Sequence, residues 1–248
     1  MRLALFSDIH GNLPALEALL ADLRIQAPDF LLCLGDVAMT GPFPNECLQA
    51  VAALDCDLVS SGVVMGNADQ ALLEPLPAFV PRGLPDEQEI YDLDAWSHAA
   101  VGEKEREWVR AYQPTLRPTP ELLAFHGSPA SNTEVLDAGS PQERLNQLRA
   151  EYGDAPLWIG GHTHRPLLRS LDGWTLLNPG SVGMPFELRN GHYVNPARAD
   201  YLILDLVAGV FQPQFRQVPY APRRVQNGFL GAKVPHAAKW VAEWVDVR

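Results

Sequence analysis

Seven side chains that can bind metals follow apolar runs along the chain. Each run has the length and composition of a buried strand, and glycines flank most of the polar residues that come next. Because ligand sites in open α/β sheets lie outside the carboxyl ends of the strands, we expect these side chains to meet in one crevice. The segments are Ser7-Asp8-Ile9-His10-Gly11, Gly35-Asp36, Gly66-Asn67-Ala68-Asp69, His126-Gly127-Ser128 and Gly160-Gly161-His162-Thr163-His164.

The chemical types of these groups indicate a pair of divalent transition metals. Imidazole, carboxylate and amide oxygen together suit Mn²⁺, Fe, Zn or Ni better than Ca or Mg, which prefer shells of oxygen. The spacing of Asp8 and His10, and of His162 and His164, puts both members of each pair on one side of an extended segment. A set of seven ligands suits two metals that share a carboxylate. Paired ions about 3.5–4 Å apart are the usual arrangement for in-line displacement at phosphorus.

Alternating strands and helices are expected to carry these segments, which is typical of a layered α/β fold with parallel pairing. Strands are expected at 2–6, 29–34, 57–65, 121–125 and 156–159, with hairpins at 166–178 and 201–217. Helices are expected behind the capping residue Asn12, over 44–54 and over 142–152. The hairpin turns are placed at Asp172-Gly173 and Ala208-Gly209.

Residues 1–248 are expected to form a single domain with two additions. Residues 72–120 are predicted to form a helical insertion rather than a separate domain, because the segment is too short for a core of its own. Residues 219–248 form a C-terminal extension, with a helix over 233–245 that carries Trp240 and Trp244. We expect this helix to dock on the domain, and a homo-oligomer contact through it is the alternative.

Composition limits the partners and the compartment. The net charge of −11 argues against bulk nucleic-acid binding, which needs a basic surface, whereas metals can hold a small phosphate ester. No apolar stretch reaches membrane length, and Met1–Phe6 is too short for a signal-peptide core. The cysteines, at positions 33, 47 and 56, have no metal or redox spacing. We therefore expect a cytoplasmic protein with a small phosphate-ester substrate and no membrane contact.

The ordered segments resemble the motifs of the calcineurin-like metallophosphoesterase superfamily. The resemblance covers roughly residues 2–182, and 178–183 resembles a segment of the small bacterial and archaeal phosphodiesterase branch. It implies an α/β fold arranged as a four-layer αββα sandwich, with the metal site at its apex. It also implies a ligand set of Asp8, His10 and His164 for the first metal, Asn67, His126 and His162 for the second, and Asp36 as the bridge.

The resemblance further implies hydrolysis by a metal-bound hydroxide, without a phosphoenzyme. Mn²⁺ is the favoured metal, with Fe, Zn or Ni as alternatives. Asp36 and Asn67 are assigned catalytic roles, and Asn67 also contacts the substrate. Asp69 is expected to orient the ligands rather than act as an acid. Arg165 is expected to bind a phosphate oxygen, with a structural salt bridge as the alternative.

Ala68 departs from the family pattern. The best-known members carry a histidine here, close to the leaving-group oxygen, and alanine can neither protonate nor hydrogen-bond that oxygen. Loss of a general acid costs about 10²–10⁴-fold on poor leaving groups. Strained cyclic diesters and aryl esters need less help, so the sequence predicts a phosphodiesterase for small diesters, 2′,3′-cyclic nucleotides among them.

Several residues are candidates to assist such a reaction. His98, in the helical insertion, and His192 could replace the missing acid, while Phe43 and Tyr91 could stack a base. The alternatives within the same fold are a phosphomonoesterase and a dinucleoside polyphosphate hydrolase, although few basic residues besides Arg165 adjoin the motifs. A non-catalytic scaffold that binds a protein is the third alternative, but such proteins lose metal ligands, and all are present here.

Overall fold

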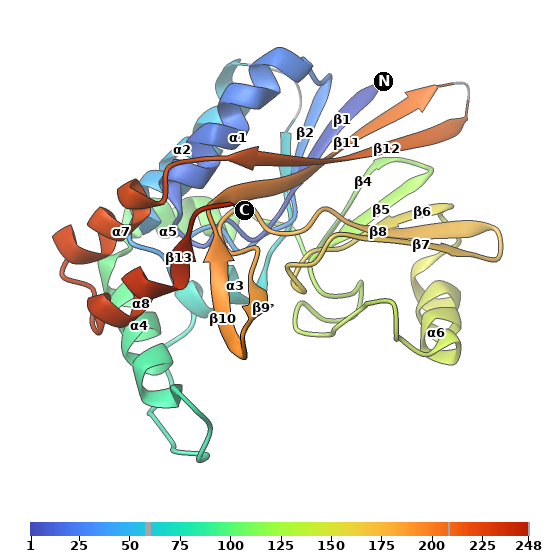
Figure 1. The fold of residues 1–248 in the computed structure, drawn as a ribbon. Coiled ribbons are helices and arrows are strands. Elements are labelled where there is room, and N and C mark those ends of the chain that lie inside the picture. Colours follow the sequence, from blue (N-terminus) through green and yellow to red (C-terminus); the bar gives the residue numbers. More distant parts are fainter. Residues whose placement is uncertain (58–60, 208, 248) are drawn as a thin grey trace.

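Two five-stranded sheets share an apolar interior in the computed structural model, which describes residues 1–57, 61–207 and 209–247. Figure 1 shows the two sheets side by side at the centre of the molecule. In order across the first sheet, the strands are β12 (Val210–Pro219), β11 (Arg198–Val207), β1 (Arg2–Phe6), β2 (Phe30–Cys33) and β3 (Ser61–Val63). In the second they are β4 (Thr115–Thr119), β5 (Leu122–Phe125), β6 (Leu157–Ile159), β8 (Trp174–Asn178) and β7 (Leu167–Leu171).

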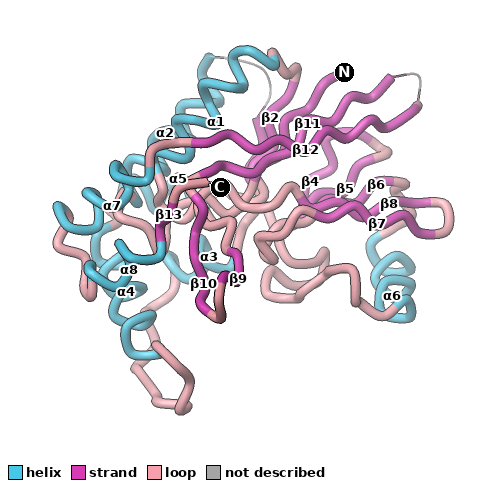
Figure 2. The backbone as a smooth tube through the Cα atoms, viewed as in Figure 1, coloured by secondary structure: helices cyan, strands magenta, loops and turns pink. Residues whose placement is uncertain are grey.

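The alternation of side chains along β1 explains how the sheets are covered. Leu3 and Leu5 pack in the interior that the two sheets share, whereas Ala4 and Phe6 pack against helices on the other face. A strand buried on both faces is apolar throughout, as this one is. Figure 2 shows helices beside both sheets: α1 (Leu13–Gln26) and α2 (Pro44–Asp57) beside the first, and α6 (Gln142–Tyr152) beside the second.

Parallel pairing brings the strand ends together. β1 pairs with β2 and β2 with β3 in the parallel sense, and β5, β6 and β8 do the same in the second sheet. The carboxyl ends of these strands therefore lie at one edge of each sheet. Asn12 starts α1 directly behind the first ligand segment, because its Oδ1 accepts a hydrogen bond from the Ala15 backbone N–H at 3.2 Å.

The mixed α/β class is confirmed, and several expected boundaries change. α2 runs to Asp57 and β3 covers only Ser61–Val63, and residues 58–60 of the expected strand lie outside the described residues. α3 (Asn67–Leu73) was not expected. The helices of the insertion, α4 (Glu87–Ala100) and α5 (Glu103–Arg110), end before β4, so the last residues of 72–120 belong to the second sheet. Residues Thr115–Thr119 pair with β5, and this pairing makes them a strand of the second sheet.

The C-terminal extension also differs from the expected single helix. It contains α7 (Pro222–Gly231) and the shorter α8 (Ala237–Glu243), and Trp244 begins β13 (Trp244–Val245). β13 joins a small sheet with β10 (His192–Pro196) and β9 (Glu187–Arg189). Trp240 and Trp244 are buried with Leu93 of α4, so both tryptophans are used within the chain rather than exposed. Figure 1 shows α7 and α8 beside α4.

Three smaller expectations can be compared with the structure. The first hairpin forms as β7 and β8, and the second is longer than expected, with the turn residue Ala208 outside the described residues. Cys33 and Cys47 are buried free thiols, whereas the side chain of Cys56 lies outside what the structure describes. Within the described ranges, no helix combines the length and apolar character needed to cross a membrane.

Candidate metal centre

Six of the seven expected ligands form two compact groups at the edge where the strands end. In each group the ligand atoms lie within 4.8 Å of one another. The seventh, Asn67, begins α3, and its Oδ1 lies 3.1 Å from Nε2 of His126. The structure therefore brings all the candidates together. The groups are Asp8, His10 and His164, and Asp36, His126 and His162.

Asp36 lies between the two groups. Its Oδ2 is 3.3 Å from His126 Nε2 in its own group and 3.8 Å from His10 Nε2 in the other. Its Oδ1 accepts a hydrogen bond from the backbone N–H of Ala68 at 2.8 Å. One oxygen is therefore held by the protein and the other faces both groups, which is the geometry that a bridging carboxylate requires.

The backbone at these ligands adopts a conformation that side chains seldom take. Asp8, His10, Asp36, His162 and His164 all have positive φ, between 47° and 67°. A residue held in the left-handed region costs of order 1–3 kcal/mol, and such residues cluster at functional sites. Hydrogen bonds between neighbouring ligand loops hold this conformation: the N–H of Asp8 donates to Gly35 O at 3.0 Å and that of His10 to Asp36 O at 2.9 Å. The sharp turns direct side chains from separate strands into one crevice.

Backbone carbonyls orient three of the imidazoles. Nδ1 of His126 lies 2.6 Å from Leu34 O, that of His10 lies 3.1 Å from Met39 O, and that of His164 lies 2.8 Å from Met184 O. Since a carbonyl oxygen can only accept, each Nδ1 carries a proton, and Nε2 is the nitrogen whose lone pair is available to a metal whenever the ring is neutral. Metal-binding histidines are held in this way in other proteins.

The buried carboxylates of the crevice favour a bound positive charge. Burial by itself raises the pKa of Asp8, but the imidazoles of His164 and His10 outweigh it and hold that pKa well below its usual value. Burial lowers the pKa of His126, but the charge of Asp36 and its hydrogen bond outweigh this and raise the value to about 10. Among the described residues, the buried Oδ1 of Asp8 has no hydrogen-bond partner. Positive charge is thus favoured at this place, and an unpartnered carboxylate oxygen beside imidazoles fits a bound cation, which would replace the protons on those rings.

Asp69 supports this arrangement without facing the ligands. Its carboxylate accepts backbone hydrogen bonds from Asp36 at 2.7 Å, Val37 at 2.9 Å and Gly66 at 3.1 Å, and so joins the loops after β2 and β3. Burial, together with the charge of Asp36, raises the pKa of Asp69 to about 6. Its contacts match the orienting role expected from the sequence.

Comparison with known proteins identifies the family. The model of the calcineurin-like phosphoesterase superfamily domain matches residues 1–201. This chain belongs to that superfamily. The superfamily is metal-dependent, and the two ligand groups lie within the matched residues.

Individual relatives are similar over nearly the whole chain. The uncharacterized protein MJ0912 of Methanocaldococcus jannaschii is 27% identical over 97% of this chain and 96% of its own length. Phosphodiesterase YfcE of Escherichia coli is 28% identical over 90% of this chain and 100% of its own length. The crystal structure of a metallophosphoesterase from Sphaerobacter thermophilus is 26% identical, covers 98% of both chains and has a TM-score of 0.73.

The two histidines expected to replace the missing superfamily acid lie outside the ligand groups. Nε2 of His98 is 3.0 Å from the backbone oxygen of Glu74, and Arg106 donates to the His98 carbonyl, so these contacts tie His98 into the insertion. His192 is exposed near the tip of the β9–β10 hairpin, where it pairs with Arg189. Neither contact places an imidazole beside the ligand groups, and a role for either histidine as the acid stays a prediction.

The expected base-stacking residues are also used elsewhere. Phe43 packs against α7 so closely that a Cβ added at Gly228 would lie 2.4 Å from its ring. The hydroxyl of Tyr91 donates to Pro77 O at 3.0 Å, and its ring packs on Phe79 at 5.2 Å. Arg165, by contrast, is exposed, and within the described part of the chain it forms no ion pair, so the structural salt bridge is not observed.

Asp94 is a carboxylate near the centre that the motifs do not indicate. It lies on α4 three residues before Ser97, whose Oγ accepts from the Thr40 backbone N–H at 3.2 Å, next to the Met39 that orients His10. Burial raises the pKa of Asp94 to about 6, and the charge of His10 opposes that rise. An acidic residue in a helix with many polar residues does not stand out in the sequence as part of a site. Only the packing of α4 brings Asp94 near the metal ligands.

Proposed function

We propose that this chain is a dinuclear metal-dependent phosphodiesterase that hydrolyses small phosphodiesters, 2′,3′-cyclic nucleotides among them. The observation that carries the proposal is the position of Asp36, whose Oδ2 lies 3.3 Å from Nε2 of His126 in its own ligand group and 3.8 Å from Nε2 of His10 in the other. Two metals bound there would generate a nucleophile from water at neutral pH and neutralise the charge that develops at phosphorus. The name of the E. coli relative, a phosphodiesterase, supports this reaction class.

The residues of the chain divide the work between holding and orienting. Asp8, His10 and His164 surround one position, and Asn67, His126 and His162 the other, with Asp36 between them. The carbonyls behind the imidazoles hold a proton on each Nδ1 and turn each Nε2 toward the crevice, so the rings do not have to reorient when a cation binds. Imidazole and carboxylate donors accept several first-row divalent ions. Mn²⁺, which the family resemblance favours, is the proposed metal, with Fe, Zn or Ni as alternatives.

Ala68 carries the preference for diesters. Its backbone N–H still positions Asp36, but its methyl group has no proton to give to a leaving oxygen. Hydrolysis of an alkyl phosphate monoester expels an alkoxide and depends on such a proton. Hydrolysis of strained cyclic diesters and of aryl diesters depends on it less. We therefore expect diesters to be cleaved faster than alkyl monoesters.

The test compares substrates on protein that has been stripped of metal and reloaded with Mn²⁺. Bis-p-nitrophenyl phosphate, p-nitrophenyl phosphate and 2′,3′-cAMP are assayed with the native chain, with Asp36→Asn, and with Asp172→Asn, which makes the same change in the exposed β7–β8 turn. We expect metal-dependent diester cleavage that Asp36→Asn abolishes and Asp172→Asn retains. Dominant monoester cleavage would overturn the preference for diesters, and inactivity on every substrate with two metals bound would overturn the reaction class.

A further inference from the structure

An aromatic ring lies directly against one of the candidate metal ligands. The ring centroids of Phe186 and His164 are 5.3 Å apart, with the planes tilted by 45°. The carbonyl of Met184 faces Nδ1 of His164 at 2.8 Å and also accepts from the Phe186 backbone N–H at 2.8 Å. The same carbonyl therefore orients the ligand and places the ring, which fixes Phe186 relative to the metal centre.

Next to Phe186 lies a second aromatic ring, that of Tyr193, which is exposed to solvent. Its ring meets Phe186 edge to face, with centroids 5.7 Å apart and planes at 88°, and Tyr193 is 63% exposed. It lies on β10, which pairs with β9 on one side and with β13 on the other. The pair of rings is thus an accessible aromatic surface on a hairpin anchored to the body of the protein.

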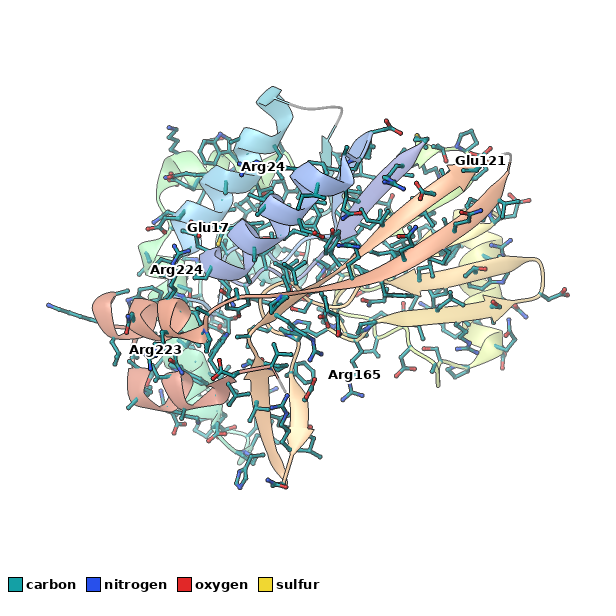
Figure 3. The ribbon with its side chains drawn as sticks, turned by 45° about the horizontal axis from the view of Figure 1, so that its top comes forward. Glu17, Arg24, Glu121, Arg165, Arg223 and Arg224 are labelled. Atoms are coloured by element: carbon teal, nitrogen blue, oxygen red, sulfur yellow. The ribbon has the colours of Figure 1, made fainter. Side chains whose placement is uncertain are left out.

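A cation without a partner lies on the same surface. The guanidinium carbon of Arg165 is 5.7 Å from the centre of the Phe186 ring. Glu187, which follows Phe186, already accepts from Arg198 and pairs with Arg189, and within the described ranges no acidic group pairs with Arg165. Figure 3 shows the Arg165 side chain reaching outward near this hairpin. Its charge is free to bind an anionic oxygen.

We propose that Phe186 and Tyr193 bind the nucleobase of the substrate and that Arg165 binds a phosphoryl oxygen, which makes nucleoside phosphodiesters the substrate class. This inference rests on the proposed function, because it places the phosphoryl group at the metals and the base beside His164. Aromatic side chains stack on any base, since every base has a π face, and a guanidinium suits phosphate oxygens. Loss of one stack lowers affinity by about 5- to 150-fold.

The test measures binding rather than turnover. AMP and ribose 5-phosphate share the phosphorylated ribose and differ at C1, where AMP carries adenine and ribose 5-phosphate a hydroxyl. Their affinities for the Mn²⁺-loaded chain are measured by isothermal titration calorimetry. If either ligand is cleaved, the same ratio is read from the KM values. We expect AMP to bind about 5- to 150-fold more tightly than ribose 5-phosphate. We expect Phe186→Leu and Tyr193→Leu to bring this ratio toward one while ribose 5-phosphate affinity is retained.

Two further variants separate the roles. Arg165→Gln should weaken both ligands by a similar factor and leave their ratio unchanged, because both carry the phosphate. Phe215→Leu, the same kind of change at a 40% exposed ring on β12, should change neither affinity. Because Tyr193 is largely exposed, Tyr193→Leu decides the question if Phe186→Leu loses metal.

Two results would overturn the inference. One is a ratio near one in the native chain, and the other is a ratio that persists in the Phe186→Leu, Tyr193→Leu double variant. A failure of the proposed function has a different signature: ribose 5-phosphate binding that does not depend on Mn²⁺.

Discussion

The Nε2 atoms of His10 and His164 lie 3.1 Å apart, although 154 residues separate the two histidines along the chain. Both rings turn their Nδ1 toward a backbone carbonyl, so neither Nε2 carries a proton when the rings are neutral. Two lone pairs at this distance repel each other unless a proton or a metal cation lies between them, and Oδ1 of Asp8, 3.3 Å from His164 Nε2, adds a negative charge that favours a cation. Because this contact lies within the group of Asp8, His10 and His164, the first metal position can be tested separately from the second.

His164→Ala should remove one metal and leave the other. The variant loses an imidazole from the group that contains Asp8 and His10, while the group around His126 is intact. We expect about two Mn²⁺ per native chain and about one per variant by elemental analysis after dialysis, with diester turnover lowered by about 10²-fold or more. Two retained Mn²⁺ would contradict this assignment.

Ala68→His should restore help to the leaving group. An imidazole next to Asn67 could donate a proton to an ester oxygen, and such assistance contributes about 10²–10⁴-fold on poor leaving groups. The measurement is kcat/KM across diesters whose leaving groups span a range of pKa, for which we expect a flatter dependence in the variant. Ala68→Leu is the control, since it fills space without a proton, and an equal slope in both variants would refute the role of position 68.

Asp69→Asn should destabilise the fold. The carboxylate accepts three backbone N–H groups in a buried place, and an amide can accept through one oxygen only. An unsatisfied buried donor costs about 1–3 kcal/mol, and we expect a loss of that size in the free energy of unfolding measured with urea. The exposed Asp172→Asn serves as the matched substitution, and an equal effect of the two changes would contradict the prediction.

Glu243 should make stability depend on pH. Burial raises the pKa of Glu243 from its ordinary value of 4.5 to about 7. In the unfolded chain the carboxyl ionises freely above pH 4.5, whereas the folded chain resists ionisation up to about pH 7. Folding stability is therefore lost as the pH rises through this window.

Glu243→Gln removes that loss. We expect the unfolding free energy of the variant to be about 1 kcal/mol higher than that of the native chain at pH 8, a value reduced for the partial exposure of Glu243. At pH 5, close to the pKa of the unfolded carboxyl, we expect the difference to fall to about a quarter of that value. Urea denaturation at the two pH values checks this, with the exposed Glu121→Gln as control. A difference that is equal at both pH values would rule out titration of Glu243 as its cause.

The ligand residues could be predicted from the sequence because their signals are local. An apolar run followed by glycine and a metal-binding group marks a strand end, and the order of such ends along the chain resembles one superfamily. The strand Arg2–Phe6 and the helix behind Asn12 follow from the same short-range rules of alternation and capping. For these elements the deciding interactions lie within a few residues of one another.

Tertiary structure alone decided how distant segments meet. The contact of His10 with His164, the position of Asp94 near the centre and the placement of Phe186 on His164 each join residues whose separation in sequence carries no pattern. The packing of α4 sets the contact of His98 with Glu74, and it also provides Leu93, against which Trp240 and Trp244 of the docked C-terminal extension are buried. The physical reason is that side-chain periodicity encodes which face of an element is buried, whereas the partner for that face is chosen by the pairing and packing of the whole chain.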